Sequence, residues 1–124
     1  ALATAKPEHY AKDILDHFEL TPYFDVIVGA NYESGLLHKK EILEKALELC
    51  GNPLTDENGN RMVFMVGDRK YDVEAANELG CISIGVTYGY GTEAELKEAD
   101  AEYLCDDVDE IADVLDLEAL MVRR

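Results

Sequence analysis

The stretch MVFMVGDRKYDVEAANELG, residues 62–80, decides the fold. Residues 62–66 are apolar at every position, which is typical of a parallel strand that is buried on both faces. Gly67 and Asp68 end this run, and residues 72–79 have the pattern of a short helix that Gly80 would cap at its carboxyl end. A buried strand, a tight turn and a helix together form the repeating unit of a parallel α/β sheet.

The same unit recurs on both sides of this stretch. Further strands are expected at residues 1–4, 25–28, 81–86 and, as a weak edge strand, 101–105. Helices are expected over residues 7–21, 42–50, 92–98, where Thr92 and Glu95 would form a capping box, and from Asp106 or Asp107 to Ala119. This order predicts an α/β fold with a doubly wound parallel sheet and helices on both faces, formed by residues 1–124 as one domain. Any functional site is expected beyond the carboxyl ends of the strands.

Composition narrows the classes of function. The chain has 124 residues, is 48% hydrophobic and carries a formal charge of −16, so a nucleic-acid backbone or an anionic membrane surface is not expected as a partner. No stretch has the length of a membrane span or the pattern of a leader peptide, and we expect a cytoplasmic protein. Cys50, Cys81 and Cys105 lack the spacing of a zinc site or a disulfide framework, and are expected to be reduced thiols in or near the core.

Residues that could carry chemistry follow the predicted strands. Thr4 ends the first strand, Lys39 precedes the apolar stripe of the second helix, and Asp68 and Asp72 follow residues 62–66. Taken singly, Thr4 and Asp72 could be helix caps, and a first-turn lysine could be a solvated charge. Taken together, a hydroxyl, an ammonium group and two carboxylates at one sheet edge can bind a phosphoryl group and Mg²⁺.

Four segments carry a resemblance to a known family. TAKPE at residues 4–8, HKKEI at 38–42 and MVGDRKYDVEAA at 65–76 resemble the second, third and fourth motifs of the haloacid dehalogenase (HAD) superfamily of phosphatases. IGVTYGYGTEAEL at 84–96 extends the likeness, which is nearest to the phosphoglycolate phosphatase-like branch. The segments occur in the family's order and span most of the chain.

The resemblance implies roles for individual residues. Thr4 would bind the phosphoryl group, helped by the backbone amide of Ala5, and Lys39 would supply the compensating charge, with Lys40 as the neighbour if the register is shifted by one residue. Asp68 would bind Mg²⁺, and Asp72 would bind the metal directly, bind it through water, or brace Lys39.

The resemblance also implies an activity. It is Mg²⁺-dependent hydrolysis of a small phosphorylated metabolite through an aspartyl-phosphate, with phosphoglycolate as the first candidate. A 5′-nucleotide, pyrophosphate or a sugar-phosphate mutase reaction are alternatives within the family. A noncatalytic α/β module that binds phosphate or a partner is the alternative from another class.

The sequence departs from the family at its beginning. The Asp-x-Asp-x-Thr motif that carries the nucleophile is absent, and so are the cap and the central strand that the motif belongs to. The chain therefore resembles the C-terminal part of a HAD-like Rossmannoid core, and we expect it to be inactive alone. The missing strand would leave a slot between residues 1–4 and 62–66, and we expect the protein's own N-terminal fragment or a second copy to fill it.

Several charged and aromatic residues have no assigned catalytic role. Arg69 and Lys70 are expected to be solvated or to form salt bridges, and the acidic stretch at residues 93–118 to form solvated helix faces. For Tyr88 and Tyr90, in the glycine-rich loop, local packing beside glycines with positive φ is one interpretation, and contact with substrate is the other.

Overall fold

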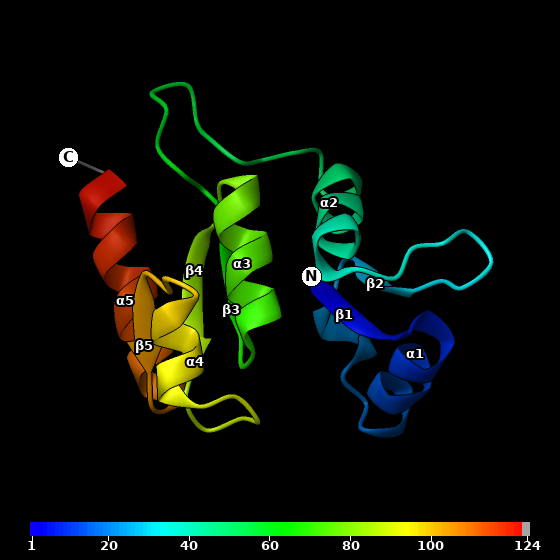
Figure 1. Ribbon diagram of the computed structural model, residues 1–124. Helices are drawn as coiled ribbons and strands as arrows, with labels where there is room; N and C mark the ends of the chain where they lie inside the picture. The colour runs from blue at the N-terminus through cyan, green and yellow to red at the C-terminus, as the bar shows by residue number, and fades with distance from the viewer. Residues whose placement is uncertain (123–124) are drawn as a thin grey trace. The chain divides into compact units, whose positions relative to one another are not determined.

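The computed structural model describes the backbone of residues 1–122 and the side chains of residues 1–119. The chain forms two compact units, Ala1–Pro53 and Leu54–Arg124. Each unit has its own parallel sheet, and the elements of both are labelled in Figure 1.

The first unit contains a two-stranded sheet with a helix on either face. Its elements are β1 (Leu2–Pro7), α1 (Glu8–His17), a 3-10 helix (Thr21–Tyr23), β2 (Ile27–Ala30) and α2 (Lys39–Leu49). Strands β1 and β2 pair in parallel. Val28 and Ala30 of β2 pack against Ile42 of α2. Gly29, between them, has its Cα hydrogens on the opposite face of the sheet, toward α1. A Cβ built on Gly29 would lie 2.4 Å from the Cα of Glu8, so only glycine allows α1 to begin this close to the strand.

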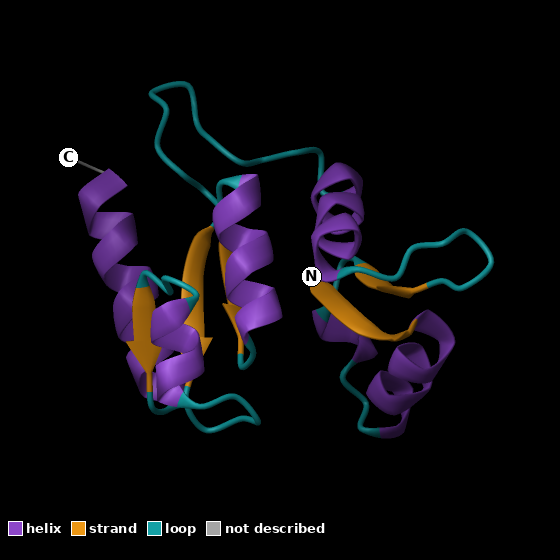
Figure 2. Ribbon diagram, in the orientation of Figure 1, coloured by secondary structure: helices purple, strands orange, loops and turns teal. Residues whose placement is uncertain are grey.

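The second unit contains a three-stranded parallel sheet in the order β3-β4-β5. Its elements are β3 (Phe64–Gly67), α3 (Lys70–Leu79), β4 (Ile82–Val86), α4 (Glu93–Glu98), β5 (Tyr103–Cys105) and α5 (Val108–Val122), shown by type in Figure 2. Ile84 of β4 belongs to a core cluster with Ile111 of α5. The other face of β4 meets α3, since the Ser83 hydroxyl donates a 2.8 Å hydrogen bond to the Asn77 side chain. Helices therefore cover both faces.

The predicted fold class is confirmed, with parallel strands and helices on both faces of each sheet. The apolar run at residues 62–66 does not make β3 a fully buried strand. All residues of β4 are buried, whereas Val66 of β3 is 41% exposed. The reason is position, because β4 lies between two strands and β3 lies at the edge of its sheet. An apolar run indicates that helices can cover both faces of a strand, but it does not show whether another strand pairs with each of its two edges.

The apolar residues of the predicted helices at 7–21 and 106–119, and Cys50, are expected to face the core, but several of them are exposed. In α1, Ala11 and Leu15 are buried as expected, but Tyr10, Ile14 and Phe18 are exposed. In α5, Val114 packs on the core together with Ile111, while the expected Val108, Ala112, Leu115 and Ala119 are exposed. Cys50 is exposed, whereas Cys81 and Cys105 are buried free thiols as predicted. Within the described residues, none of the helices is long and apolar enough to cross a membrane.

Two helices begin earlier than their apolar stripes indicate. Helix α2 starts at Lys39 and α3 at Lys70, one turn or less before the first stripe residue, and β1 extends to Pro7, past the predicted end at Thr4. First turns are polar because their amides face solvent or side-chain acceptors, so hydrophobic periodicity does not detect them. These polar turns contain several of the candidate site residues.

Candidate functional site

In the first unit, the predicted phosphate residues lie in an irregular part of β1. Ala3 is opposite Val28 and Pro7 is opposite Ala30, so residues 4–6 of β1 lie opposite Gly29 alone. This shift is a β-bulge, a feature that frequently re-aims side chains beside functional sites. The bulge contains both Thr4 and Ala5.

The hydroxyl of Thr4 shapes this bulge. Its Oγ1 accepts a 3.2 Å hydrogen bond from the backbone amide of Lys6. Thr4 is half-buried and Ala5 is exposed. The predicted helix-capping role of Thr4 is not seen, because α1 begins four residues later at Glu8 and Pro7 occupies its N-cap.

Lys39 is held beside the same bulge. It is the first residue of α2, and its Nζ donates a 2.5 Å hydrogen bond to the backbone carbonyl of Ala3. Lys39 is half-buried and Lys40 is exposed. The structure therefore places an ammonium group next to the residue that precedes Thr4. A hydroxyl and an ammonium group in one place are suited to an anionic oxygen ligand.

A separate hollow of about 380 Å³ lies at the carboxyl ends of β1 and β2, lined by residues 7–9 and 30–33. Thr4, Ala5 and Lys39 do not line it. Part of its wall is an Asx turn, in which Asn31 Oδ1 accepts hydrogen bonds from the backbone amides of Glu33 and Ser34. The amide oxygen of Asn31 thus stabilises the loop.

In the second unit, residues 67–70 form what we call the Asp68 turn, between β3 and α3. Asp72 is buried, and its Oδ2 accepts hydrogen bonds from the backbone amides of Asp68 at 3.1 Å and Arg69 at 3.2 Å. A Cβ built on Gly67 would lie 2.2 Å from the Cβ of Asp72, so glycine is required there. Asp72 holds the turn as a helix cap does, which is one of the two interpretations that the sequence left open.

The glycine-rich loop between β4 and α4 contacts the Asp68 turn. The amide of Tyr90 donates a 2.8 Å hydrogen bond to Asp68 Oδ2, and the amide of Gly91 donates to the Asp68 carbonyl at 3.0 Å. A Cβ on Gly89 would lie 2.3 Å from the Asp68 Cβ. The glycines therefore allow close approach. The prediction of positive φ was wrong for Gly89 and Gly91. The prediction that the tyrosines pack locally was also wrong, since Tyr90 is 94% exposed.

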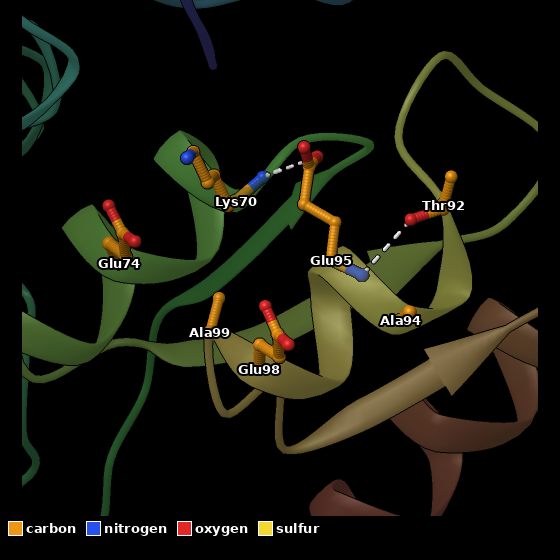
Figure 3. Close-up of a pocket in the computed structure, with 7 residues that line it drawn as sticks. All are labelled: Lys70, Glu74, Thr92, Ala94, Glu95, Glu98 and Ala99. Atoms are coloured by element: carbon orange, nitrogen blue, oxygen red, sulfur yellow. Dashed lines mark hydrogen bonds between the residues drawn. The ribbon is translucent and has the colours of Figure 1, made fainter.

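Glu95, at the start of α4, binds the other end of the Asp68 turn (Figure 3). Its Oε2 accepts from Arg69 Nε at 2.9 Å and from the Lys70 amide at 3.1 Å, and its Oε1 accepts from an Arg69 Nη at 3.3 Å. Hydrogen bonding to Arg69, followed by that to the Lys70 amide, lowers the pKa of Glu95. The same hydrogen bond raises the pKa of Arg69. The salt bridge expected for Arg69 is thus present.

The sequence pattern did not predict this role of Glu95. Half of the expected capping box is present, because the Glu95 amide donates a 3.1 Å hydrogen bond to Thr92 Oγ1 (Figure 3). The Glu95 carboxylate, however, binds the Asp68 turn. One pattern in the sequence could have indicated this salt bridge. Arg69 and Lys70 follow one predicted strand, and the glycine-rich loop after the next strand leads to a helix whose first turn is acidic, so the opposite charges are expected at the same edge of the sheet.

The donor chemistry of the Asp68 turn fits Mg²⁺. The described residues contain no cluster of three or more His, Cys, Asp or Glu side chains that could hold a metal ion without other ligands. Mg²⁺ does not need such a cluster, because it is commonly bound by one or two carboxylates and completes its shell with water and phosphate oxygens. Asp68 is half-buried at the turn and Asp72 is four residues away, so the turn can supply these carboxylates.

Comparison with known proteins gives a consistent result. A model of the HAD-hydrolase-like family matches residues 38–111. A 5′-nucleotidase of Pseudomonas aeruginosa is 33% identical over 115 residues, which cover 93% of this chain and 49% of that protein. A phosphoglycolate phosphatase of Vibrio cholerae is 29% identical over 119 residues, which cover 93% of this chain and 48% of that protein.

A solved structure is similar over the same extent. A predicted phosphatase from Clostridium acetobutylicum is 40% identical and superposes with a TM-score of 0.80, over 92% of this chain and 50% of that one. The chain thus spans about half the length of the relatives it matches.

Proposed function

This chain belongs to the HAD-like hydrolase family, and from that premise we propose that the intact protein is a Mg²⁺-dependent phosphatase of small phosphomonoesters. The observation that carries the proposal is the hydrogen bond from Lys39 Nζ to the Ala3 carbonyl, which holds a positive charge beside Thr4. That arrangement is suited to a phosphoryl group. It lies in the β1 bulge, whose residues 4–6 are part of the segment that resembles the second family motif.

In this proposal the first unit binds the phosphoryl oxygens. The Thr4 hydroxyl and the Ala5 amide donate to them, and the Lys39 ammonium balances their negative charge. The formal charge of −16 does not oppose this at contact distance, because distant surface carboxylates are screened over a Debye length of about 8 Å at physiological salt.

The second unit would hold Mg²⁺ through Asp68. When bound, Mg²⁺ would supply positive charge for the oxygens of a phosphorylated ligand. Asp72 keeps the Asp68 turn in place through the amides of Asp68 and Arg69, and we propose that its role toward the metal is positioning.

The attacking aspartate is proposed to come from outside residues 1–124, since the chain has no Asp-x-Asp-x-Thr motif. The strand that carries it would also complete a sheet. β3 is an edge strand with Val66 exposed, and such an edge recruits another strand. We propose that the protein's own N-terminal fragment or a second copy fills this position. A folded, strictly monomeric 124-residue species, measured by light scattering, would contradict this proposal.

Two substrates have specific support. The phosphoglycolate phosphatase of V. cholerae and the 5′-nucleotidase of P. aeruginosa match almost the same share of this chain. Phosphoglycolate remains the first candidate because the motifs are nearest to that branch, and 5′-nucleotides are the second. Phosphate release by the intact protein from phosphoglycolate and from a panel of 5′-nucleotides, each with and without Mg²⁺, distinguishes the two.

One substitution tests the proposed chemistry itself. Asp68→Asn removes a charged metal ligand, so it should abolish most Mg²⁺-dependent turnover. Glu98→Gln removes the same charge from an exposed position on α4 and should leave turnover unchanged. Turnover that survives Asp68→Asn would overturn the metal role of Asp68. An intact protein that binds phosphate but hydrolyses nothing would support the noncatalytic alternative.

A further inference from the structure

We infer that Glu95 positions Asp68 for metal binding, both by fixing the Asp68 turn and by keeping the Arg69 guanidinium away from the Asp68 carboxylate. The inference rests on the proposed function of Asp68 and assigns a role to a residue outside the family motifs. Glu95 is a positioning residue because its contacts are to the Asp68 turn itself.

The first part of the inference comes from the contacts that surround the turn. Asp72 holds the amides of Asp68 and Arg69 from α3, and the loop amides of Tyr90 and Gly91 hold Asp68 from the opposite side. The amide of Lys70 is held by Glu95 Oε2 at 3.1 Å. Glu95 therefore completes the set of hydrogen bonds that fix the backbone of the turn.

The second part comes from the charge of Arg69, the residue next to Asp68 in the chain. Its guanidinium forms a two-point salt bridge with Glu95, at 2.9 Å from Nε and 3.3 Å from an Nη atom. Two-point pairing fixes both the position and the orientation of a guanidinium group. The charge of Asp68 also acts on Arg69, because it contributes, after Glu95 and Tyr71, to the raised pKa of Arg69. Without Glu95, Asp68 is the nearby carboxylate that Arg69 would pair with, in competition with Mg²⁺.

A matched control is available in the same helix. Glu98 lies one turn after Glu95 in α4 and lines the same hollow of about 430 Å³ beside α3 (Figure 3). Glu98 is exposed, and none of the hydrogen bonds found among the described residues joins it to the Asp68 turn. Glu98→Ala therefore removes the same charge from the same helix without touching the turn.

The test is the affinity of the intact protein for Mg²⁺ alone, measured by isothermal titration calorimetry with no substrate present. Glu95→Ala should weaken binding about tenfold, the lower end of what removal of an outer-sphere partner costs. Glu98→Ala should leave binding unchanged. In the double variant Arg69→Ala/Glu95→Ala the competing cation is gone, so part of the lost affinity should return, while the part due to the missing Lys70 amide contact should not. Glu95→Gln, which keeps an acceptor for the Lys70 amide, should lie between wild type and Glu95→Ala.

The double variant separates positioning from general support of the fold. If Glu95 only stabilised the unit, removing Arg69 as well would not restore affinity, and that result overturns the inference. Equal affinities of Glu95→Ala and Glu98→Ala also overturn it. Asp68→Asn is measured in parallel: if it binds Mg²⁺ as tightly as wild type, the proposed metal role of Asp68 fails, which is distinct from a failure of Glu95 alone. Should Glu95→Ala not fold, Glu95→Gln and its double variant with Arg69→Ala give the same comparison.

Discussion

The ammonium group of Lys39 donates a 2.5 Å hydrogen bond to the backbone carbonyl of Ala3, a residue 36 positions earlier in the chain. Ala3 is the last paired residue before the β1 bulge, so this contact ties the start of α2 to the bulge that contains Thr4. A lysine in a first turn usually extends into solvent. Here it is half-buried and directed at the backbone of a neighbouring strand.

Lys39→Met should therefore reduce kcat/KM of the intact protein about 100-fold or more, the range found when one stabilising donor is removed from a reacting centre. Competitive inhibition by inorganic phosphate should weaken at the same time, because the compensating charge is lost. Lys40→Met removes the same charge from the adjacent, exposed position and serves as the control. A larger loss in Lys40→Met than in Lys39→Met would show that the register of the third motif is shifted by one residue.

Gly67 and Gly85 are paired across β3 and β4, and they should differ in their tolerance of a methyl group. A Cβ on Gly67 would lie 2.2 Å from the Cβ of Asp72, whereas the three atoms nearest to a Cβ on Gly85 are the ends of Leu96 and Leu104 at 3.2 Å. Gly67→Ala should destabilise the protein by at least about 2 kcal/mol, as overpacking does. Gly85→Ala should cost less, since leucine side chains can shift. Urea unfolding of both variants checks this order, and equal losses would contradict it.

The fold class was predictable because it depends on apolar patterns that local sequence displays. The sequence predicts a strand at residues 62–66 and a helix end at Gly80. The strand is present two residues later at its start, as β3 (Phe64–Gly67), and Gly80 ends α3 with φ 85°. Local patterns do not show how completely each strand is covered, since burial depends on neighbours in the sheet. Val66 is exposed at the sheet edge although its sequence context is fully apolar.

The candidate site was predictable only as far as the motifs reach. The motifs point to Thr4, Lys39, Asp68 and Asp72, whose roles stay predictions, and the hydrogen bond of Lys39 to Ala3 places it beside Thr4. The bulge and Glu95 were missed. A bulge arises from the register between two strands that are distant in sequence, and Glu95 reaches Arg69 across 26 residues. Glu95 fits the local capping box that begins at Thr92, and this local pattern carries no information about a partner of its carboxylate 26 residues away.

The three thiols should react at different rates. Cys50 is exposed, whereas Cys81 and Cys105 are buried and have raised pKa values, caused first by desolvation. A higher pKa leaves less of the reactive thiolate at neutral pH. One thiol per chain should therefore react rapidly with Ellman's reagent in the native protein, and all three after denaturation. Cys50→Ser should remove the rapid phase, and rapid reaction of two or more thiols would contradict the burial described.

The Arg69–Glu95 pair should make stability depend on pH in a defined direction. The pKa of Glu95 is lowered in the folded protein by its hydrogen bonds to Arg69 and the Lys70 amide, below the ordinary value of 4.5. A carboxyl group with a depressed folded pKa contributes stability above its unfolded pKa, and this contribution is lost as the pH falls through the folded pKa. Wild type should thus be more stable than Glu95→Gln at neutral pH, and the difference should shrink steadily below pH 4.5, because protonated Glu95 resembles glutamine. Urea unfolding at a series of pH values measures this difference, and Glu98→Gln controls for loss of charge from α4.

The opposite outcome is a difference in unfolding free energy between wild type and Glu95→Gln that stays constant down to about pH 3, where an ordinary glutamate is protonated. It would show that the pair contributes through packing rather than charge.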